Sequence, residues 1–254
     1  PFMVFTDEML TWPPDPDAWS LRWYKNMIGN CSADVVSSTV PCSNKWMIGT
    51  VNSFFIGFVA TFIATTLGTL AALGLSRPHM PYKGLIMAIL ISPMIVPLII
   101  TAAGMFFFYA RINLVYSFTG IILAHVALAT PFVVITVTAT LVGFDMNMVK
   151  ASQSLGARPV RTFFKVIMPL ILPGVISGAL FAFITSFDEV VIVMFMASLD
   201  QLTIPKQMWA GIRQEISPVI LCMATCLVVL SILLLTTVEL LRRRSEKLRG
   251  ITSR

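Results

Sequence analysis

The fold of this chain is constrained most by five apolar windows, each of which is long enough to cross a lipid bilayer. About 20 residues of helix span the ~30 Å hydrocarbon core, and each window reaches that length with few or no charged residues. Since 57% of the residues are hydrophobic and only 12% are charged, a soluble globular domain is excluded. We therefore predict an all-α integral membrane protein with five transmembrane helices in this chain. The windows are residues 47–75, 85–109, 118–141, 172–197 and 217–240.

The distribution of lysine and arginine predicts the orientation of these helices. Twelve of the 18 basic residues lie in residues 76–84, in residues 143–171 or after Leu241, and the alternation of windows places these three segments on one side. Cytoplasmic connections carry the excess of basic residues in membrane proteins. Residues 143–171 and the tail 242–254 are therefore predicted to be cytoplasmic, and residues 1–46 to be external.

The external segment raises the question of how it is translocated, because residues 1–46 contain no signal peptide or anchor. The sequence also begins with Pro1 instead of methionine, so we expect a sixth transmembrane helix upstream. Cys31 and Cys42 both lie in this segment, where an oxidising compartment allows a disulfide between them but does not require one. The alternative for the whole segment is a disordered leader.

A basic segment broken by glycine, VKASQSLGARPVRTFFKVIMPLILPG, lies between the third and fourth windows at residues 149–174 and contains no acidic residue. The residues before Gly156 favour a helix, Gly156 offers a turn at positive φ, and Pro159 is placed to begin a second short helix. Pro169 and Pro173 are expected to mark its end and the entry to the next span. The pattern predicts a helix-turn-helix at the cytoplasmic surface. On physical grounds alone, it could equally be a basic hairpin that rests on anionic lipid headgroups.

This segment resembles the cytoplasmic loop of the permease subunits of binding-protein-dependent ABC importers. The family motif reads Glu-Ala-Ala, three residues, Gly, nine residues, Ile, one residue, Leu-Pro. Here Lys150 stands in place of the Glu and Ser152 in place of the second Ala, so a salt bridge made by that Glu does not carry over, whereas the helix-Gly-helix geometry does. The matching positions are Ala151, Gly156 and Pro169, with Val166 and Met168 as close substitutes.

Further segments resemble, in the same order, the spermidine/putrescine-type branch of this family across about residues 45–240. They read NSFFIGFVATFIATTLGTLAALGLSR, SPMIVPLII, LAHVALATPFVVITVTATL, SFDEVVIVMFM and MWAGIRQEISP. The resemblance implies a permease subunit of an importer in the bacterial inner membrane. It also implies a second permease subunit beside this one and an external substrate-binding protein.

In this family the cytoplasmic loop is a coupling helix that fits a groove on an ATP-binding subunit. The sequence contains no G-x-x-x-x-G-K-[ST] phosphate-binding loop of its own, so the energy source has to be a partner. We therefore expect two partner subunits that bind ATP and Mg²⁺, and no cofactor in this chain. The resemblance assigns the coupling role to Lys150, Ala151, Ser152, Leu155, Gly156, Ala157 and Pro169.

Prolines and a histidine interrupt the apolar windows. Pro93 and Pro97 lie four residues apart in the second window and Pro131 lies in the third, and each removes a backbone donor, so we expect bends there. Bent helices could line a path that opens and closes, or they could only pack together. His125 is the one ionisable residue in its window, and we expect it to hydrogen-bond a neighbouring helix; a role in the path is the alternative.

Two adjacent carboxylates, Asp188 and Glu189, lie well inside the fourth window. A charge at that depth costs on the order of 3 kcal/mol by insertion scales, and no lysine or arginine lies in any of the five windows. In one continuous helix, Thr185 and Ser186 would form a polar stripe with them. We predict that these four residues line a substrate path, where negative charge suits a polyamine-like cation. The alternative is a structural pair that is bonded to the backbone or to another subunit.

These observations predict a permease domain over residues 47–241 that supplies half of a translocation path for a small cationic solute and carries out no bond-making reaction. No catalytic residue, metal site or nucleic-acid partner is expected. A stand-alone ion-coupled carrier or channel is the alternative, but no inverted repeat is detected. A metal-dependent hydrolase would lack ligands, because His79 and His125 are the two histidines of the chain and no H-E-x-x-H motif occurs.

Overall fold

The computed structural model describes residues 21–29, 44–77, 79–143, 147–214 and 218–248. All regular secondary structure in these ranges is helical, and the chain divides into two units, residues 48–207 and residues 1–47 with 208–254. Cys31 and Cys42, between which the sequence allows a disulfide, lie outside the described residues. The helices are α1 (Arg22–Ile28), α2 (Lys45–Leu75), α3 (Lys83–Ile95), α4 (Leu98–Arg111), α5 (Phe118–Val142), α6 (Asn147–Ser154), α7 (Pro159–Thr162), a π-helical turn (Phe163–Ile167), α8 (Met168–Phe187), α9 (Val191–Met196), a 3₁₀ turn (Leu199–Gln201), α10 (Ile204–Gln214) and α11 (Pro218–Leu248).

Every predicted apolar window contains helix, but only three helical runs among the described residues are single spans long and apolar enough to cross a membrane. These are α2, α5 and the continuous run Pro159–Phe187, which includes α8. The second window passes the same test only as a pair, because α3 and α4 are bent by 103°. The fifth window coincides with α11, which runs from Pro218 to Leu248 and is apolar over Pro218–Leu233.

The bend between α3 and α4 confirms the expected proline break in the second window. α3 ends at Ile95, Val96 is extended with φ −71° and ψ 136°, and Pro97 is the N-cap of α4. Pro93 lies inside α3. The third window behaves differently, because α5 runs without interruption through Pro131, which is buried among its neighbours.

The fourth window is not the single helix that its hydropathy predicts. α8 ends at Phe187, Asp188 is its C-cap with φ −87° and ψ 0°, and α9 begins only at Val191. A continuous helix would leave two adjacent carboxylates without backbone donors in an apolar setting, which is costly. Ending the helix at this point provides the free N–H groups of a new helix start, and the Glu189 carboxylate accepts a hydrogen bond from one of them.

α5 and α8 pack closely along their length because α8 presents a small residue at every fourth position. A Cβ added to Gly178 would lie 2.5 Å from Thr136 Oγ1 and 3.1 Å from Val133 Cα of α5, and Gly174 faces the Thr140 hydroxyl even more closely. Small residues let the backbones of membrane helices approach each other in this way. The small, buried residues of α8 are Gly174, Gly178, Ala182 and Ser186.

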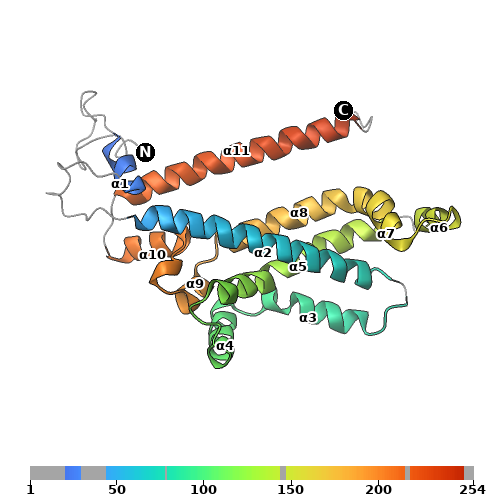
Figure 1. Ribbon diagram of the computed structural model, residues 1–254, viewed down its shortest axis with the longest axis horizontal. Coiled ribbons are helices and arrows are strands. Elements are labelled where there is room, and N and C mark those ends of the chain that lie inside the picture. The colour runs from blue at the N-terminus through green and yellow to red at the C-terminus, as the bar shows by residue number, and fades with distance from the viewer. Residues whose placement is uncertain (1–20, 30–43, 78, 144–146, 215–217, 249–254) are drawn as a thin grey trace. The chain divides into compact units, whose positions relative to one another are not determined.

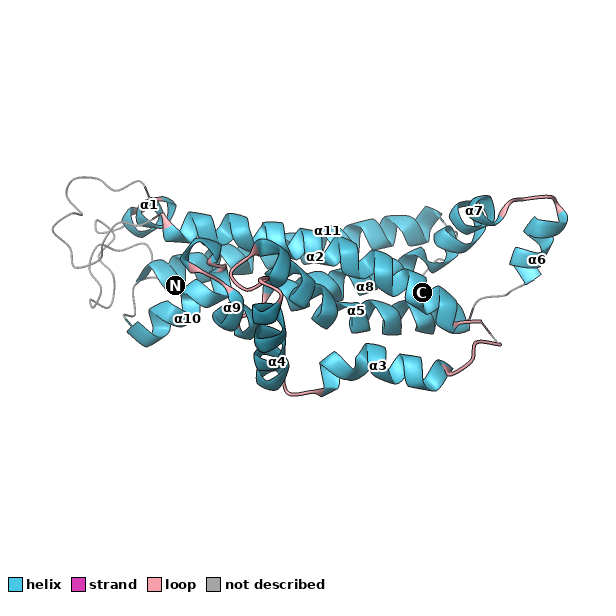
Figure 2. Cartoon of the chain, turned by 60° about the horizontal axis from the view of Figure 1, so that its bottom comes forward, coloured by secondary structure: helices cyan, strands magenta, loops and turns pink. Residues whose placement is uncertain are grey.

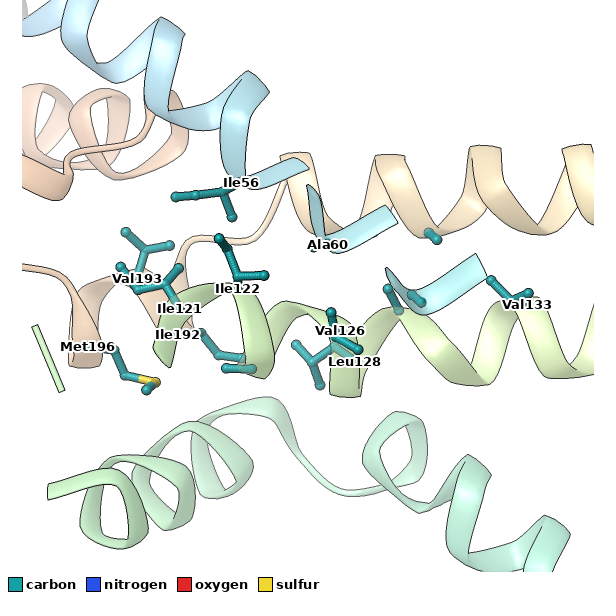
Figure 3. Close-up of a cluster of buried hydrophobic side chains, with 14 of the residues drawn as sticks. Ile56, Ala60, Ile121, Ile122, Val126, Leu128, Val133, Ile192, Val193 and Met196 are labelled. Atoms are coloured by element: carbon teal, nitrogen blue, oxygen red, sulfur yellow. The ribbon is translucent and has the colours of Figure 1, made fainter. Parts of the chain in front are cut away.

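The core of residues 48–207 lies where α9 meets α2 and the first turns of α5. Ile56 of α2, Ile121 of α5 and Ile192 of α9 are almost completely buried and point toward one another (Figure 3). Met196, in the last turn of α9, belongs to the same cluster. α9 is therefore an inserted part of the core, although it has only six residues.

The other unit joins the short helix α1 to the start of α11. Trp23 of α1 is 5% exposed and packs in one cluster with Val219 and Cys222 of α11. α1 ends at Gly29, whose φ of 81° gives a left-handed C-cap. α11 continues to Leu248, so the first arginines of the predicted basic tail are helical.

Candidate functional site

Two candidate regions lie at opposite ends of α8. The segment α6–α7 precedes its first residue, and α9 follows its last, so the two regions stand apart along the helix (Figures 1 and 2). With 20 residues, α8 measures about 30 Å from end to end. The single helix therefore connects the predicted coupling segment to the predicted carboxylate site.

The predicted coupling segment is a compact hairpin that turns at Gly156, which confirms the predicted helix-glycine-helix geometry. Gly156 has φ +79°, a region that residues with a Cβ rarely adopt. The Gly156 N–H donates to Gln153 O at 2.9 Å and the Ala157 N–H to Ser152 O at 3.1 Å. This pair of bonds is the Schellman arrangement that ends a helix on a left-handed residue.

The second arm of the hairpin runs directly into the membrane helix. Pro159 is the first residue of α7, as predicted, because a helix start does not need its missing N–H. Pro169 stands in the first turn of α8 and so marks the entry to the next helix, as expected, whereas α7 already ends at Thr162 and Pro173 lies inside α8. The missing donor of Pro169 is tolerated because Pro169 falls in the first turn of α8, directly after a π-helical turn, Phe163–Ile167.

A hydroxyl pair ties the two arms of the hairpin together. Ser152 Oγ lies 3.0 Å from Thr162 Oγ1, and the Ser152 hydroxyl donates to Val149 O at 2.8 Å. Thr162 is only 2% exposed. Sequence reasoning included Ser152 among the coupling residues, as a departure from the family motif, but missed Thr162, which lies ten residues away from it. The serine thus adds a contact between the arms that alanine could not make.

We expect Ser152→Ala, which restores the motif residue, to loosen the hairpin. Loss of a partly buried hydroxyl contact of this kind costs about 1 kcal/mol, so amide hydrogen exchange across residues 147–162 should become several-fold faster in the purified complex. Ser154→Ala is the matched control, because the Ser154 hydroxyl bonds only within its own helix, to Lys150 O at 3.0 Å. Equal exchange rates in both variants would contradict the tying role of Ser152.

The hairpin exposes apolar side chains next to basic ones. Leu155 at its tip is 89% exposed, and Val160 on the second arm is 68% exposed. Among the predicted coupling residues, Lys150, Ala151, Leu155, Gly156 and Pro169 are exposed, while Ser152 and Ala157 are half-buried.

At the other end of α8, the structure separates the two adjacent carboxylates. Glu189 is 7% exposed, and its Oε1 accepts a hydrogen bond of 2.9 Å from the N–H of Ile192 in the first turn of α9. Asp188 is exposed, and its side chain has no hydrogen-bond partner among the described residues. Of the pair, only Asp188 is open to a ligand from outside the chain.

The predicted polar stripe below these carboxylates is wrong, because α8 ends before Asp188. Ser186 points into the bundle, where its Oγ lies 2.8 Å from His125 Nδ1 of α5. This contact confirms that His125 bonds a neighbouring helix, and both side chains are buried. Thr185 is half-buried. The four predicted path residues therefore do not line one surface.

Sequence reasoning missed Lys206, which bonds the far end of α9. Its Nζ donates to Ala197 O at 3.0 Å and to Val193 O at 3.3 Å. Partial burial lowers the pKa of the Lys206 ammonium below its ordinary value, because desolvation disfavours the charged form. Lys206 sits outside the apolar windows, 13 residues from Val193, and nothing in the local sequence pattern signals the contact.

A network of polar side chains holds the segment after α9 against α2 and the start of α5. Asn52 Nδ2 donates to Asp200 O and to Leu202 O, each at 3.0 Å, and the Ser53 hydroxyl accepts from Ile204 N–H at 2.8 Å. Gln201 Nε2 donates to Tyr116 O at 2.9 Å. This end of residues 48–207 is therefore fixed by directional bonds in addition to apolar packing.

The face of α8 that is turned away from the seam with α5 remains exposed in this chain. It carries large apolar side chains at helical spacing, and Asp188 follows at its end. An apolar face of this kind suits lipid or another membrane helix. The exposed residues of this face are Ile176, Leu180 and Ile184.

Comparison with solved structures supports this arrangement of helices. The chain resembles a chain of the MetNI methionine ABC transporter in an inward-facing conformation, with a TM-score of 0.56 and 22% sequence identity. The similarity covers 81% of this chain and 95% of that one. At this level of identity, the comparison shows the fold.

Comparison with characterised sequences gives relatives over most of the chain. It is 29% identical over 228 residues to the spermidine/putrescine transport system permease protein PotC of Haemophilus influenzae, covering 90% of this chain and 84% of that protein. It is 31% identical over 190 residues to PotC of Escherichia coli K12, covering 75% and 72%. The putrescine transport system permease protein PotI of Escherichia coli K12 is 28% identical over 215 residues, covering 82% and 72%.

The family model for the inner membrane component of binding-protein-dependent transport systems matches residues 64–247. The matched region contains the Gly156 hairpin, α8 and α9, which are the parts that the geometry singles out. The relatives and the shared fold agree with that match. This chain therefore belongs to the family of binding-protein-dependent transport system inner membrane components.

Proposed function

We propose that this permease supplies half of the path by which an ATP-driven importer moves a small, polyamine-like cation. The observation that carries the proposal is Asp188, an exposed carboxylate at the end of the exposed apolar face of α8. A carboxylate in an apolar membrane setting is costly and therefore marks a candidate functional site, and a bound cation would offset its charge. The relatives named for spermidine and putrescine transport support the same class of cargo.

The hairpin α6–α7 is the proposed docking knob for an ATP-binding subunit. Its exposed leucine tip, Leu155, offers an apolar anchor for a groove, and Lys150 and Arg158 beside it are exposed and positive. The Gly156 turn fixes the two arms in a compact shape. Two such subunits would bind ATP and Mg²⁺, one on each permease.

The exposed face of α8 is the proposed contact with the second permease subunit. A path between two permeases needs a helix that packs tightly within its own chain and leaves another face open, and α8 does both. In this arrangement the hairpin end is cytoplasmic, and the Asp188 end is nearer the outside. An external substrate-binding protein would deliver the cargo to that side, to which residues 1–46 also belong, while the tail 242–254 lies in the cytoplasm.

A stand-alone carrier or channel is not favoured, because the family consists of components of multi-subunit transport systems. The decisive experiment is to purify the assembled complex with its binding protein and to titrate that protein with amines, amino acids and anions. We expect saturable binding of a di- or polyamine, followed by ATP-dependent uptake into vesicles. Uptake of an anion or a neutral amino acid, with none of an amine, would overturn the proposed cargo.

The charge of Asp188 is expected to act during translocation. Asp188→Asn keeps the size of the side chain, so assembly should be unchanged, while ATP-dependent amine uptake should fall about tenfold or more, as expected for loss of a charge-assisted contact. Asp200→Asn is the matched control, since Asp200 is also an exposed aspartate and lies in the 3₁₀ turn after α9. Parental uptake in Asp188→Asn would exclude Asp188 from the path.

A further inference from the structure

The short helix α9 cannot be stable by itself. Six residues, Val191–Met196, form less than two turns, and isolated helices of that length are not populated in water. Three of its side chains, Ile192, Val193 and Met196, are fully buried, so the helix is part of the core. Its ends, however, carry backbone N–H and C=O groups that have no partners within the helix, and these groups need bonds from elsewhere.

The N-terminal end of α9 is bonded by Glu189. The carboxylate accepts the Ile192 N–H at 2.9 Å, and the Val191 N–H also bonds it. A negative charge at this position interacts favourably with the helix dipole as well as with the free donors. Glu189 is only 7% exposed, so its carboxylate lies in the protein interior.

The C-terminal end of α9 is bonded by Lys206 from the start of α10. The ammonium donates to Val193 O and Ala197 O, two carbonyls of the last turn and of the residue that follows the helix. A positive charge is favourable at this pole of the dipole. The Tyr116 N–H satisfies a third carbonyl, Met196 O, at 2.9 Å.

From this geometry we propose that Glu189 and Lys206 are a pair of positioning residues that hold α9 from its two ends and keep it beside Asp188. Among the described residues the two charges are not paired with each other, and each bonds the backbone of α9 instead. Glu189 therefore does not serve as a second ligand for the cargo. Its part in transport, which rests on the proposed function, is to hold α9 against the end of α8 until the permease changes state.

The accessibility of a buried α9 residue tests this proposal without any need for transport. In the assembled complex, with the four native cysteines replaced by alanine, Val193→Cys would be labelled with a membrane-impermeant maleimide. Val193 is fully buried, so the labelling rate reports the opening of α9. Glu189→Leu and Lys206→Met should each raise this rate about five- to tenfold, as expected when a capping interaction is lost.

Conservative variants and neighbours separate positioning from general damage. Glu189→Gln keeps an acceptor and Lys206→Arg keeps donors, so both should restore slow labelling. Two variants are matched controls, Asp188→Asn at the position before Glu189 and Arg213→Leu at an exposed basic residue later in α10. Both should label at the parental rate. In vesicles, the two apolar variants should lower the maximal uptake rate while leaving the KM for the loaded binding protein unchanged.

The exchanged double variant Glu189→Lys with Lys206→Glu distinguishes capping from an ion pair. If the residues stabilise each other as a pair, the exchange should restore slow labelling, and this result would overturn the proposal. If each caps one pole of α9, the exchange places both charges at the wrong pole, and labelling should be the fastest of the series. Parental labelling in both apolar single variants would also overturn the proposal, even if Asp188→Asn still lowered amine uptake. A cargo of another class would leave the labelling results unchanged and would overturn only the proposed function.

Discussion

Replacing Gly178 by leucine is expected to abolish the folded permease. The Cβ alone would lie 2.5 Å from Thr136 Oγ1 and 3.1 Å from the backbone of Val133, so α5 and α8 could not keep their separation. Overpacking a core typically costs about 1–3 kcal/mol, and this contact involves backbone, which cannot rotate away. We expect little monodisperse protein after solubilisation and no co-purification of partner subunits.

Gly104→Leu provides the matched control for that experiment. Gly104 lies in α4, and an added Cβ would meet nothing within 4 Å. Its replacement should leave size-exclusion profiles and thermal unfolding close to those of the parent. Gly178→Ala should fall between the two, because the Thr136 hydroxyl can rotate away from a single methyl group. A parental melting temperature in Gly178→Leu would show that the seam between α5 and α8 is looser than the structure indicates.

Replacing Gly156 by valine is expected to abolish transport while leaving the membrane helices folded. The position has open space around it, so the effect arises only from φ, which is +79°. A β-branched residue is strongly disfavoured there and would break the Schellman bonds of α6. The variant should insert and unfold like the parent but lose substrate-stimulated ATPase activity and uptake.

Gly156→Asn separates backbone conformation from other effects of the substitution. Asparagine adopts the left-handed region with less strain than other residues, and the open space accommodates its side chain. We therefore expect most of the coupled ATPase activity to remain in Gly156→Asn. Full stimulation of ATPase activity in Gly156→Val would exclude the hairpin as the coupling element.

The sequence predicted those parts of the structure that depend on local residue types. Long apolar windows identified the helices, and Gly156 and Pro159 identified the hairpin, because left-handed turns and helix starts favour those residues directly. Pro97 marked the break between α3 and α4 for the same reason. In each of these cases the cause lies within a few residues of its effect.

The break after Phe187 could not be predicted in the same way. Averaged hydropathy treats residues 172–197 as one window, and the two carboxylates were read as charges within a helix instead of as its end. The hydrogen bond of Glu189 depends on the new helix start at α9, and Lys206 bonds a carbonyl from the other side of the loop that follows α9. Thr162 was missed because its partner is on the other arm of the hairpin. Such contacts become visible only when the chain is folded.

The small residues of α8 restrict how this permease can move. Gly174, Gly178 and Ser186 face larger side chains or backbone of α5, so the two helices interdigitate and could slide past each other only in steps of a whole turn, about 5.4 Å. Smaller displacements must therefore carry both helices together as one stiff lever. A tilt of about 10° applied where the lever meets the Gly156 hairpin would move the opposite end, at Asp188, by about 5 Å, given a length of ~30 Å. A movement of the Gly156 hairpin would thus be transmitted to the Asp188 end without any change in the packing between α5 and α8.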